Sequence, residues 1–332
     1  MRVLVTGGAG YIGSHTAHLL RARGDDVVVL DSLATGHRAA VEDLPLVVGD
    51  IRDEVLVEAV VREREIEAVI HFAALKSVEA SVGDPFGYFD VNVTGTVSLA
   101  RAAIAGGVDR LVFSSSCAVY GQPDRLPIDE GCRVAPENPY GHTKLAAEGL
   151  LASLEAATGL RTVALRYFNA AGAAQDGSSG EDWSGAVNLI PSVLRVAAGR
   201  EAVVRIYGTD FPTPDGTAIR DYVHVSDLAD AHARALDHLA AGGPSITANI
   251  GTGRGWSVRE VIEAAEAVVG HPIPTMEAGR RPGDPPAVWA DPSRASETLG
   301  WTARRQLPEM LETAWRWHRS HPEGYAGMRA GV

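Results

Sequence analysis

Short runs of apolar, often β-branched residues alternate along the first half of the chain with longer segments in which apolar residues recur at helical spacing. Apolar runs without polar alternation are typical of strands that are buried on both faces of a parallel sheet. The predicted strands are Val3–Val5, Val27–Leu30, Pro45–Val48, Ala68–His71, Arg110–Phe113 and Thr162–Leu165. The predicted helices include Glu54–Arg64, Pro85–Ala105 and Tyr140–Ala157. This order predicts an α/β fold with a doubly wound parallel sheet of the Rossmann type.

The alternation of strands and helices ends near residue 169, and prolines and glycines then separate shorter elements. Ala170–Gly185 is rich in Gly, Ser, Ala and acidic residues, which predicts a loop. We expect residues 1–169 to form a large domain and residues 170–332 a smaller α/β domain that covers the open side of the sheet. The apolar run Ile246–Ile250 is placed to return a strand to the large domain, so a segment near 207–253 is expected to cross the boundary.

Charge and cysteine content narrow the class of partner. The 332 residues have a formal net charge of −12, which argues against binding to nucleic acid or to an anionic membrane surface. Only Cys117 and Cys132 are present, too few for a disulfide framework, so we expect a reducing compartment and a cytoplasmic location. We also expect no signal peptide and no membrane span, because no apolar run approaches the ~20 residues that a span needs.

Four glycines follow the first predicted strand, at Gly7, Gly8, Gly10 and Gly13, and lead into a helical pattern. This order begins a dinucleotide-binding βαβ unit, in which a pyrophosphate approaches amide N–H groups at a helix N-terminus. A side chain at Gly7 or Gly10 would block that approach, and one at Gly13 would hold the helix away from the strand. Asp31 ends the second strand, where a carboxylate can bind ribose hydroxyls and repel a 2′-phosphate. The pattern therefore predicts bound NAD rather than NADP.

Tyr140 and Lys144 are four residues apart in a predicted helix, and therefore lie on one helical face. A phenol with its ordinary pKa of about 10 is a poor base at neutral pH. An ammonium group and a positive nicotinamide ring nearby would favour the phenolate and lower that pKa. Ser116 follows the preceding strand, where its hydroxyl is placed to bind a substrate oxygen or to relay its proton. We predict that the three residues form a catalytic set, although a Tyr-x-x-x-Lys pattern alone is more often an incidental surface pair.

Two further polar residues have both a functional and an ordinary interpretation. Lys76 follows a strand and could reach the cofactor diphosphate, or it could be a solvated loop charge. Asn92 lies among valines, where it could orient the ribose and the lysine, but an exposed asparagine is nearly as plausible. His15 and His18 have no carboxylate or thiolate at ligand spacing, so we predict no metal site.

The chain resembles the extended short-chain dehydrogenase/reductases, and within them the UDP-hexose 4-epimerases, over nearly its whole length. The resemblance lies in the segments TGGAGYIGSH, GDIRD, HFAALKSV, SSSCAVYG, NPYGHTK, LRYFNAAGA, NLIP, YGTDFPTPDGTAIRDYVHVSDLA and RRPGDPPAVWAD. The glycine-rich segment from Gly7 to Gly13, which we call the glycine turn, is shared by many reductases. The segments in the second half of the chain are more specific. The resemblance implies that the large domain binds NAD and that the smaller domain binds a UDP-hexose.

The resemblance also implies roles for individual residues. It implies that Ser116, Tyr140 and Lys144 are catalytic. The implied cofactor contacts are Gly7, Gly10, Tyr11, Ile12, Gly13, Asp31, Asp50, Ile51, Phe72, Ala73, Lys76, Asn92, Ser114, Lys144 and Tyr167. The implied substrate contacts are Phe168, Asn169, Asn188, Leu189, Tyr207, Arg220, Arg281, Asp284 and Val288.

The implied reaction inverts carbon 4 of UDP-glucose or UDP-galactose. A hydride from carbon 4 passes to tightly bound NAD and returns to the other face of the resulting 4-keto sugar, while Tyr140 takes and returns the proton. Helices formed by Pro85–Ala105 and Tyr140–Ala157 resemble the pair that joins relatives into a homodimer through a four-helix bundle. A homodimer is therefore expected.

Other activities stay open from the sequence. Val288 replaces a tyrosine of the familiar bacterial enzyme beside the sugar 2-substituent, which predicts room for an N-acetyl group and activity on UDP-N-acetylglucosamine. A sugar-nucleotide dehydratase or reductase of the same fold is a weaker alternative, because no Asp-Glu pair follows Ser116 to serve elimination of water. A redox-sensing protein without catalysis is disfavoured by the intact catalytic set.

Overall fold

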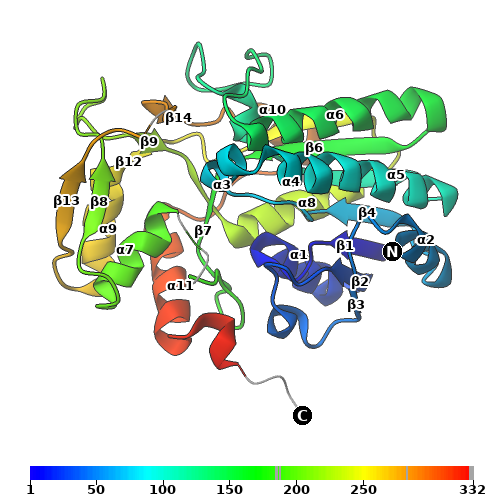
Figure 1. The fold of residues 1–332 in the computed structure, drawn as a ribbon, viewed down its shortest axis with the longest axis horizontal. Coiled ribbons are helices and arrows are strands. Elements are labelled where there is room, and N and C mark those ends of the chain that lie inside the picture. Colours follow the sequence, from blue (N-terminus) through cyan, green and yellow to red (C-terminus); the bar gives the residue numbers. More distant parts are fainter. Residues whose placement is uncertain (184–185, 187, 282, 329–332) are drawn as a thin grey trace.

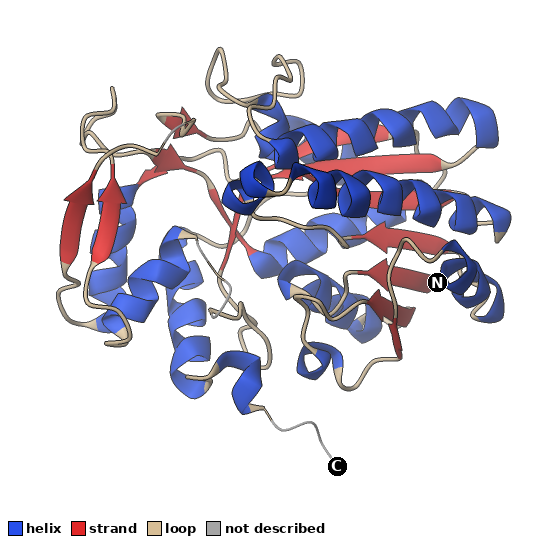
Figure 2. Ribbon diagram, in the orientation of Figure 1, coloured by secondary structure: helices blue, strands red, loops and turns tan. Residues whose placement is uncertain are grey.

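The computed structural model describes residues 1–183, 186, 188–281 and 283–328. The last two residues of the predicted loop, 184 and 185, lie outside the described residues. A seven-stranded parallel sheet forms the core of the larger part, in the order β11-β6-β5-β4-β1-β2-β3 (Figures 1 and 2). Its strands are β1 (Arg2–Thr6), β2 (Asp26–Asp31), β3 (Leu46–Val48), β4 (Ala68–His71), β5 (Arg110–Ser116), β6 (Arg161–Tyr167) and β11 (Ile246–Ile250).

Helices cover both faces of this sheet, because both faces of its strands are apolar. One face packs against α1 (Tyr11–Ala22), α8 (Val225–Ala240) and α10 (Ser293–Leu299). The other packs against α2 (Glu54–Glu63), α5 (Gly95–Ala105) and α6 (Pro139–Thr158). Val3, Leu4 and Val5 in the central strand are fully buried. The prediction of a doubly wound parallel Rossmann sheet is therefore confirmed.

The predicted segment Pro85–Ala105 is helical along its length but is not one regular helix. It consists of α4 (Pro85–Phe89), a π-helical turn at Asp90–Thr94, and α5. A π-helical turn widens the backbone locally and is often found at functional sites. It contains Asn92, which is 3% exposed, so the alternative of an exposed asparagine is wrong.

The second half of the chain builds a smaller body at the carboxyl ends of the strands (Figure 1). Its helices α7 (Leu189–Ala197), α9 (Val258–Val269) and α11 (Leu307–Ser320) enclose a separate apolar core. Short strands pair around that core: β7 (Asn169–Ala171) with β10 (Tyr222–His224), and β8 (Val204–Tyr207) with β13 (Thr275–Ala278). The strand β9 (Ile219–Arg220) lies between β12 (Trp256–Ser257) and β14 (Ala287–Val288). Helix α3 (Val78–Gly83) precedes α4 in the larger part.

Two parts of this arrangement differ from the predicted elements. Residues 170 and 171 belong to β7 rather than to a loop. Helix α8 is absent from the predicted elements, yet it packs on the large sheet together with α1. The chain thus returns to the large sheet through α8 and then β11, which pairs with β6.

No helix in the described part of the chain is long and apolar enough to cross a membrane.

Candidate functional site

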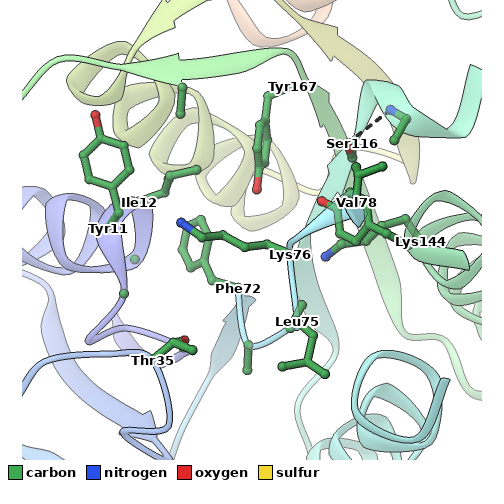
Figure 3. Close-up of a pocket in the computed structure, with 18 of the residues that line it drawn as sticks. Tyr11, Ile12, Thr35, Phe72, Leu75, Lys76, Val78, Ser116, Lys144 and Tyr167 are labelled. Carbon is green, nitrogen blue, oxygen red and sulfur yellow. Dashed lines mark hydrogen bonds between the residues drawn. The ribbon is translucent and has the colours of Figure 1, made fainter. Parts of the chain in front are cut away.

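A cavity of about 830 Å³ lies beyond the carboxyl ends of the central strands, between the sheet and the smaller body. Ligands of open α/β sheets bind at this edge. The volume is near the upper end of the range of roughly 300–1,000 Å³ that is typical of small-molecule sites. Figure 3 shows that predicted catalytic residues, such as Ser116, and predicted cofactor contacts, such as Tyr11 and Phe72, lie around the same cavity.

The turn after β1 accepts no side chain at two of its glycines. Gly7 has a positive φ of 69°, and a Cβ atom there would lie 2.4 Å from the backbone nitrogen of Ala73. A Cβ atom at Gly13 would lie 2.3 Å from the carbonyl oxygen of Gly7. Both contacts are with backbone atoms that cannot move aside, so the tight turn and the close approach of α1 to β1 require glycine.

The N-terminus of α1 faces the cavity without a capping side chain. Its N-cap residue is Gly10, and the described residues provide no side-chain cap and no acidic residue in its first turn. The free amide groups and the helix dipole therefore favour an anion. Asp31, at the end of β2, accepts hydrogen bonds from Ala9 N at 2.9 Å and Leu33 N at 2.8 Å. The Asp31 carboxylate thus fixes the turn after β1 and also lines the cavity. Together with the uncapped N-terminus of α1, it forms a site that fits a dinucleotide.

The three predicted catalytic residues come from two neighbouring elements. Ser116 is the last residue of β5, and its hydroxyl accepts a hydrogen bond from Ala118 N at 3.2 Å. Tyr140 and Lys144 lie in the first turns of α6, which begins at an Asn138 N-cap. The Nζ atom of Lys144 lies 5.9 Å from the centre of the Tyr140 ring. All three line the cavity, and Figure 3 shows Ser116 and Lys144 in its wall.

Burial controls the protonation of this set. It raises the pKa of Tyr140 above the usual value, and interaction with the Ser116 hydroxyl opposes this only in part. Among the protein's own groups, loss of hydration therefore dominates the pKa of Tyr140. The lowering expected from an ammonium group and a nicotinamide ring together stays a prediction. Burial also lowers the pKa of Lys144 to about 8, while the charge of Glu148 raises it. The amine thus titrates close to neutral pH.

Lys76 extends into the cavity from the loop after β4, between Phe72 and Tyr11 (Figure 3). Its Nζ atom is 3.8 Å from the carboxylate of Glu181 in the smaller body. Its side chain is nevertheless 66% exposed, so it is free to meet an anionic ligand. The Tyr167 hydroxyl lies 2.8 Å from Ser114 Oγ, which directs the ring along the cavity wall.

Two predicted cofactor residues, Asn92 and Ser114, do not line the cavity but bond to residues on the elements that do. Asn92 accepts a hydrogen bond from Leu75 N at 2.8 Å and donates to Leu75 O at 3.0 Å. It also donates to Thr143 Oγ1 at 3.0 Å, which connects the loop after β4 to α6. The carbonyl oxygen of Ser114 accepts a hydrogen bond from Lys144. Neither side chain lines the cavity, so we assign them positioning roles.

On the side of the smaller body, Arg220 and Asp284 form an ion pair of 2.5 Å. Arg220 is directed by β9 and Asp284 by the loop before β14, and both line the cavity. Arg281 stacks on the ring of Tyr207, with 3.9 Å between guanidinium carbon and ring centre. Neither residue of that pair belongs to the cavity lining.

The predicted residues divide according to whether they line this cavity. Those that line it are Gly7, Gly10, Tyr11, Ile12, Gly13, Asp31, Asp50, Ile51, Phe72, Ala73, Lys76, Ser116, Tyr140, Lys144, Tyr167, Phe168, Asn169, Asn188, Arg220, Asp284 and Val288. Those outside its lining are Asn92, Ser114, Leu189, Tyr207 and Arg281.

Several lining residues are absent from the predicted set. Thr35 and His37 line the cavity from the loop after β2, where the preceding Asp31 was the available signal. Glu181 and Asp182 line it from the acid-rich segment that was predicted only as a loop. Tyr325 lines it from near the end of the chain, and no local pattern marks it.

Comparison with known proteins identifies the family. The model of the NAD dependent epimerase/dehydratase family matches residues 3–251. The chain belongs to this family. NAD is accordingly its cofactor, as predicted, and the prediction of an enzyme is confirmed.

Individual members of the epimerase/dehydratase family are similar along the whole chain. A UDP-glucose 4-epimerase of Halalkalibacterium halodurans is 48% identical over 98% of this chain and 98% of its own. A crystal structure of UDP-glucose 4-epimerase from Brucella ovis in complex with NAD is 49% identical, with a TM-score of 0.92 over 95% of this chain and 97% of that one. The enzyme from Stenotrophomonas maltophila, with bound NAD and formylated UDP-arabinopyranose, is 45% identical, with a TM-score of 0.94 over 97% and 99%. The predicted resemblance to 4-epimerases is confirmed.

Proposed function

We propose that this family member is a UDP-glucose 4-epimerase, which interconverts UDP-glucose and UDP-galactose without net oxidation. One observation carries the proposal: the catalytic set faces the same cavity as the glycine turn on one side and the Arg220–Asp284 ion pair on the other. Bound NAD supplies a hydride acceptor and donor in such a site, together with a positive charge that favours a phenolate. The names of the similar proteins support the same activity.

The catalytic residues divide the proton transfer between them. Tyr140 takes the proton of the sugar 4-hydroxyl and later returns it. The Ser116 hydroxyl binds the same oxygen and shares the proton, because it ends the strand beside Tyr140. Lys144 supplies a buried amine at the phenol, and its charged form stabilises the phenolate.

The smaller body provides the groups that hold UDP. Arg220 can exchange its bond to Asp284 for two parallel bonds to the diphosphate, which suits a planar guanidinium. Asn169 and Asn188 line the same region and supply amide groups. Tyr207, covered by Arg281, offers an aromatic surface for uracil.

An N-acetylated UDP-hexose is a second candidate substrate. Val288 ends β14 with its side chain 7% exposed, packs against Phe168 and lines the cavity. A small aliphatic residue at this wall leaves more room than a tyrosine would. We propose that the 2-acetamido group of UDP-N-acetylglucosamine enters this room.

We propose a homodimer in which the helical segment Pro85–Ala105, formed by α4 to α5, and the helix α6 of each copy form a four-helix bundle. Phe86 of α4 is 89% exposed, and Val78, Val82 and Phe89 are also exposed on α3 and α4. Exposed apolar groups on adjacent helices favour burial against a partner. Light scattering of the protein and of Phe86→Glu tests this: two identical masses would contradict it.

The remaining assignments concern location and division of labour. We propose that the protein acts in the cytoplasm in galactose metabolism, because Cys117 and Cys132 are free thiols and the proposed product is UDP-galactose or UDP-glucose. We further propose that residues 1–169 bind NAD and that residues 170–332 bind the UDP-sugar. The return of α8 and β11 to the large sheet makes this boundary an interleaved one.

The deciding experiment is an NMR assay of the purified protein with UDP-galactose and no added cofactor. We expect conversion to UDP-glucose, with NAD released when the protein is denatured. Accumulation of an oxidised sugar with net reduction of NAD would instead indicate an oxidoreductase, and accumulation of a dehydrated sugar would indicate a dehydratase.

A further inference from the structure

The cavity has a wall that is formed by Ser179–Asp182, a segment that we call the strap. Gly180, Glu181 and Asp182 line the cavity together with the glycine turn and His37. The strap belongs to the second half of the chain, but it faces the loops after β2 and β4 of the large sheet. It therefore closes the side of the cavity where the dinucleotide-binding groups are gathered.

The strap is anchored from behind by two aromatic residues near the end of the chain. The Tyr325 hydroxyl donates to Gly180 O at 3.0 Å and accepts from Gly180 N at 3.2 Å. Trp317 donates from Nε1 to Glu181 O at 3.1 Å. A Cβ atom at Gly180 would lie 2.4 Å from the Trp317 ring, so the strap packs directly on that ring.

On its cavity side, the strap contacts the loops of the large sheet through the side chains of Asp182 and Glu181. His37 Nε2 lies 2.9 Å from Asp182 Oδ2, and the Asp182 side chain is only 12% exposed. The His37 ring also stacks on Tyr325, with ring centres 4.9 Å apart and planes inclined by 20°. Lys76 Nζ lies 3.8 Å from Glu181 Oε1, within ion-pair distance. This Oε1 atom is buried and has no hydrogen-bond partner among the described residues.

These contacts have a common geometrical consequence. The loop that contains His37 begins after Asp31, a predicted cofactor residue at the end of β2. The loop that contains Lys76 begins at the end of β4. Each loop is tied across the cavity to the strap. A dinucleotide that lies on the glycine turn can leave on this side only when the ties open.

We propose that His37 and Asp182 are positioning residues that retain the cofactor by tying the strap to the loop after β2. The inference rests on the proposed function, in which one cofactor molecule takes a hydride from carbon 4 and returns it within the same turnover. Release of the cofactor between these two steps would leave the substrate as the 4-keto sugar. A closed wall on the dinucleotide side lowers the rate of that release.

The test measures release of bound NAD rather than turnover. NAD dissociation is followed by a scavenging dehydrogenase in Asp182→Asn, His37→Gln and the wild type. We expect both variants to release NAD about tenfold faster, since loss of a largely buried charge contact acts mainly on dissociation. His18→Gln is the matched control: His18 also faces a carboxylate, Asp43 at 3.7 Å, but both residues lie in the large domain.

Further variants separate a specific tie from a general loss of structure. His37→Arg supplies a guanidinium that can pair with Asp182 and stack on Tyr325, so it should restore slow release. Unchanged release in both Asp182→Asn and His37→Gln, with unchanged thermal unfolding, would overturn the proposal. So would equally fast release in His18→Gln or His37→Arg. A wild-type protein that lacks bound NAD and does not epimerise UDP-galactose would contradict the proposed function itself.

Discussion

The Nζ atom of Lys144 donates a hydrogen bond of 2.8 Å to the carbonyl oxygen of Ser114. This bond joins the first turns of α6 to the end of β5, two residues before Ser116. The strand thereby fixes the amine and the serine hydroxyl relative to each other, and the helix fixes Tyr140 relative to both. The catalytic set is thus held by backbone atoms rather than by flexible side chains alone.

Replacement of Tyr140 by phenylalanine should remove the proton-transferring group with little change in shape. We expect turnover of UDP-galactose to fall by about 10²–10⁴-fold or more, the range for loss of a general acid–base group. NAD should stay bound, because the glycine turn and Asp31 are unchanged. The measurement is NMR turnover together with the NAD content of the purified variant. Substantial residual turnover would exclude Tyr140 as the base.

A buried ion pair supports the same helix. Glu148 accepts hydrogen bonds from Arg166 at 2.5 Å and from Ser115 Oγ at 2.5 Å, and both charged side chains are almost fully buried. Glu148→Gln should lower the free energy of unfolding by about 3–5 kcal/mol, because it leaves a buried guanidinium unpaired. It should also lower the pKa of Lys144 below about 8, since the charge of Glu148 raises that pKa.

Urea unfolding and a pH–rate profile test the two effects of Glu148→Gln separately. If charged Lys144 supports turnover, activity is lost as pH rises through the pKa of the amine, and this limb should move to lower pH in the variant. The double variant Glu148→Leu with Arg166→Met should recover part of the stability but not the position of the limb. An unmoved limb would restrict Glu148 to a structural role.

The apolar runs were sufficient to predict β1 to β6, because strands buried on both faces admit few polar residues. The ends of those strands also predicted Asp31 and Ser116, since ligands bind where parallel strands end. The π-helical turn at Asp90–Thr94 has no such signature. Asn92, within this turn, bonds to Leu75, which is 17 residues away in the chain, so the contact has no local sequence pattern.

The parts of the site that depend on tertiary contacts could not be predicted. The strap is a loop in sequence, and Tyr325 reaches it across 145 residues of chain. The three residues of β7, Asn-Ala-Ala, have weak strand propensity and are held by pairing with β10. In α8, buried Asp227 and His232 interrupt the apolar stripe. Asp227 accepts hydrogen bonds from the backbone and side chain of Arg305, which lies beyond the helix in the sequence. Such positions are determined by partners that are distant in the sequence.

Val288 should set tolerance for an N-acetyl group. We expect Val288→Tyr to lower turnover of UDP-N-acetylgalactosamine by at least about tenfold relative to UDP-galactose, because a larger ring fills the wall of the cavity. Val288→Leu, which adds less volume, should give a smaller change in the same ratio. Both substrates are followed by NMR with each variant. No wild-type turnover of the N-acetylated sugar, or an unchanged ratio in Val288→Tyr, would contradict the assignment.

Buried histidines should make the fold sensitive to mild acid. Burial lowers the pKa of five histidines from about 6.5 to between about 3 and about 4. They are His15, His71, His224, His232 and His318. Below pH 6.5 the unfolded chain therefore binds protons that the native state excludes. Stability is fully present above this pH and falls as pH decreases toward 4, by up to about 1.4 kcal/mol per pH unit for each histidine.

Two carboxyl groups, Asp221 and Glu181, oppose this trend without reversing it, because burial raises the pKa of each. Burial raises the pKa of Asp221 to about 6, so its native form binds a proton before the unfolded form does as the pH falls. The net difference still favours proton uptake by the unfolded chain. Urea unfolding at pH 7, 6 and 5 should show a falling midpoint at constant slope.

His318→Phe isolates one of these histidines. His318 stacks on Trp183 with ring centres 4.1 Å apart and planes inclined by 9°, and its Nδ1 atom has no hydrogen-bond partner among the described residues. Phenylalanine preserves the stacking and removes a group that the unfolded chain protonates. The variant should therefore lose less stability than the wild type between pH 7 and pH 5, by about one proton's share of the slope. Identical pH dependence in the two proteins would show that His318 has the same pKa in the native and unfolded states.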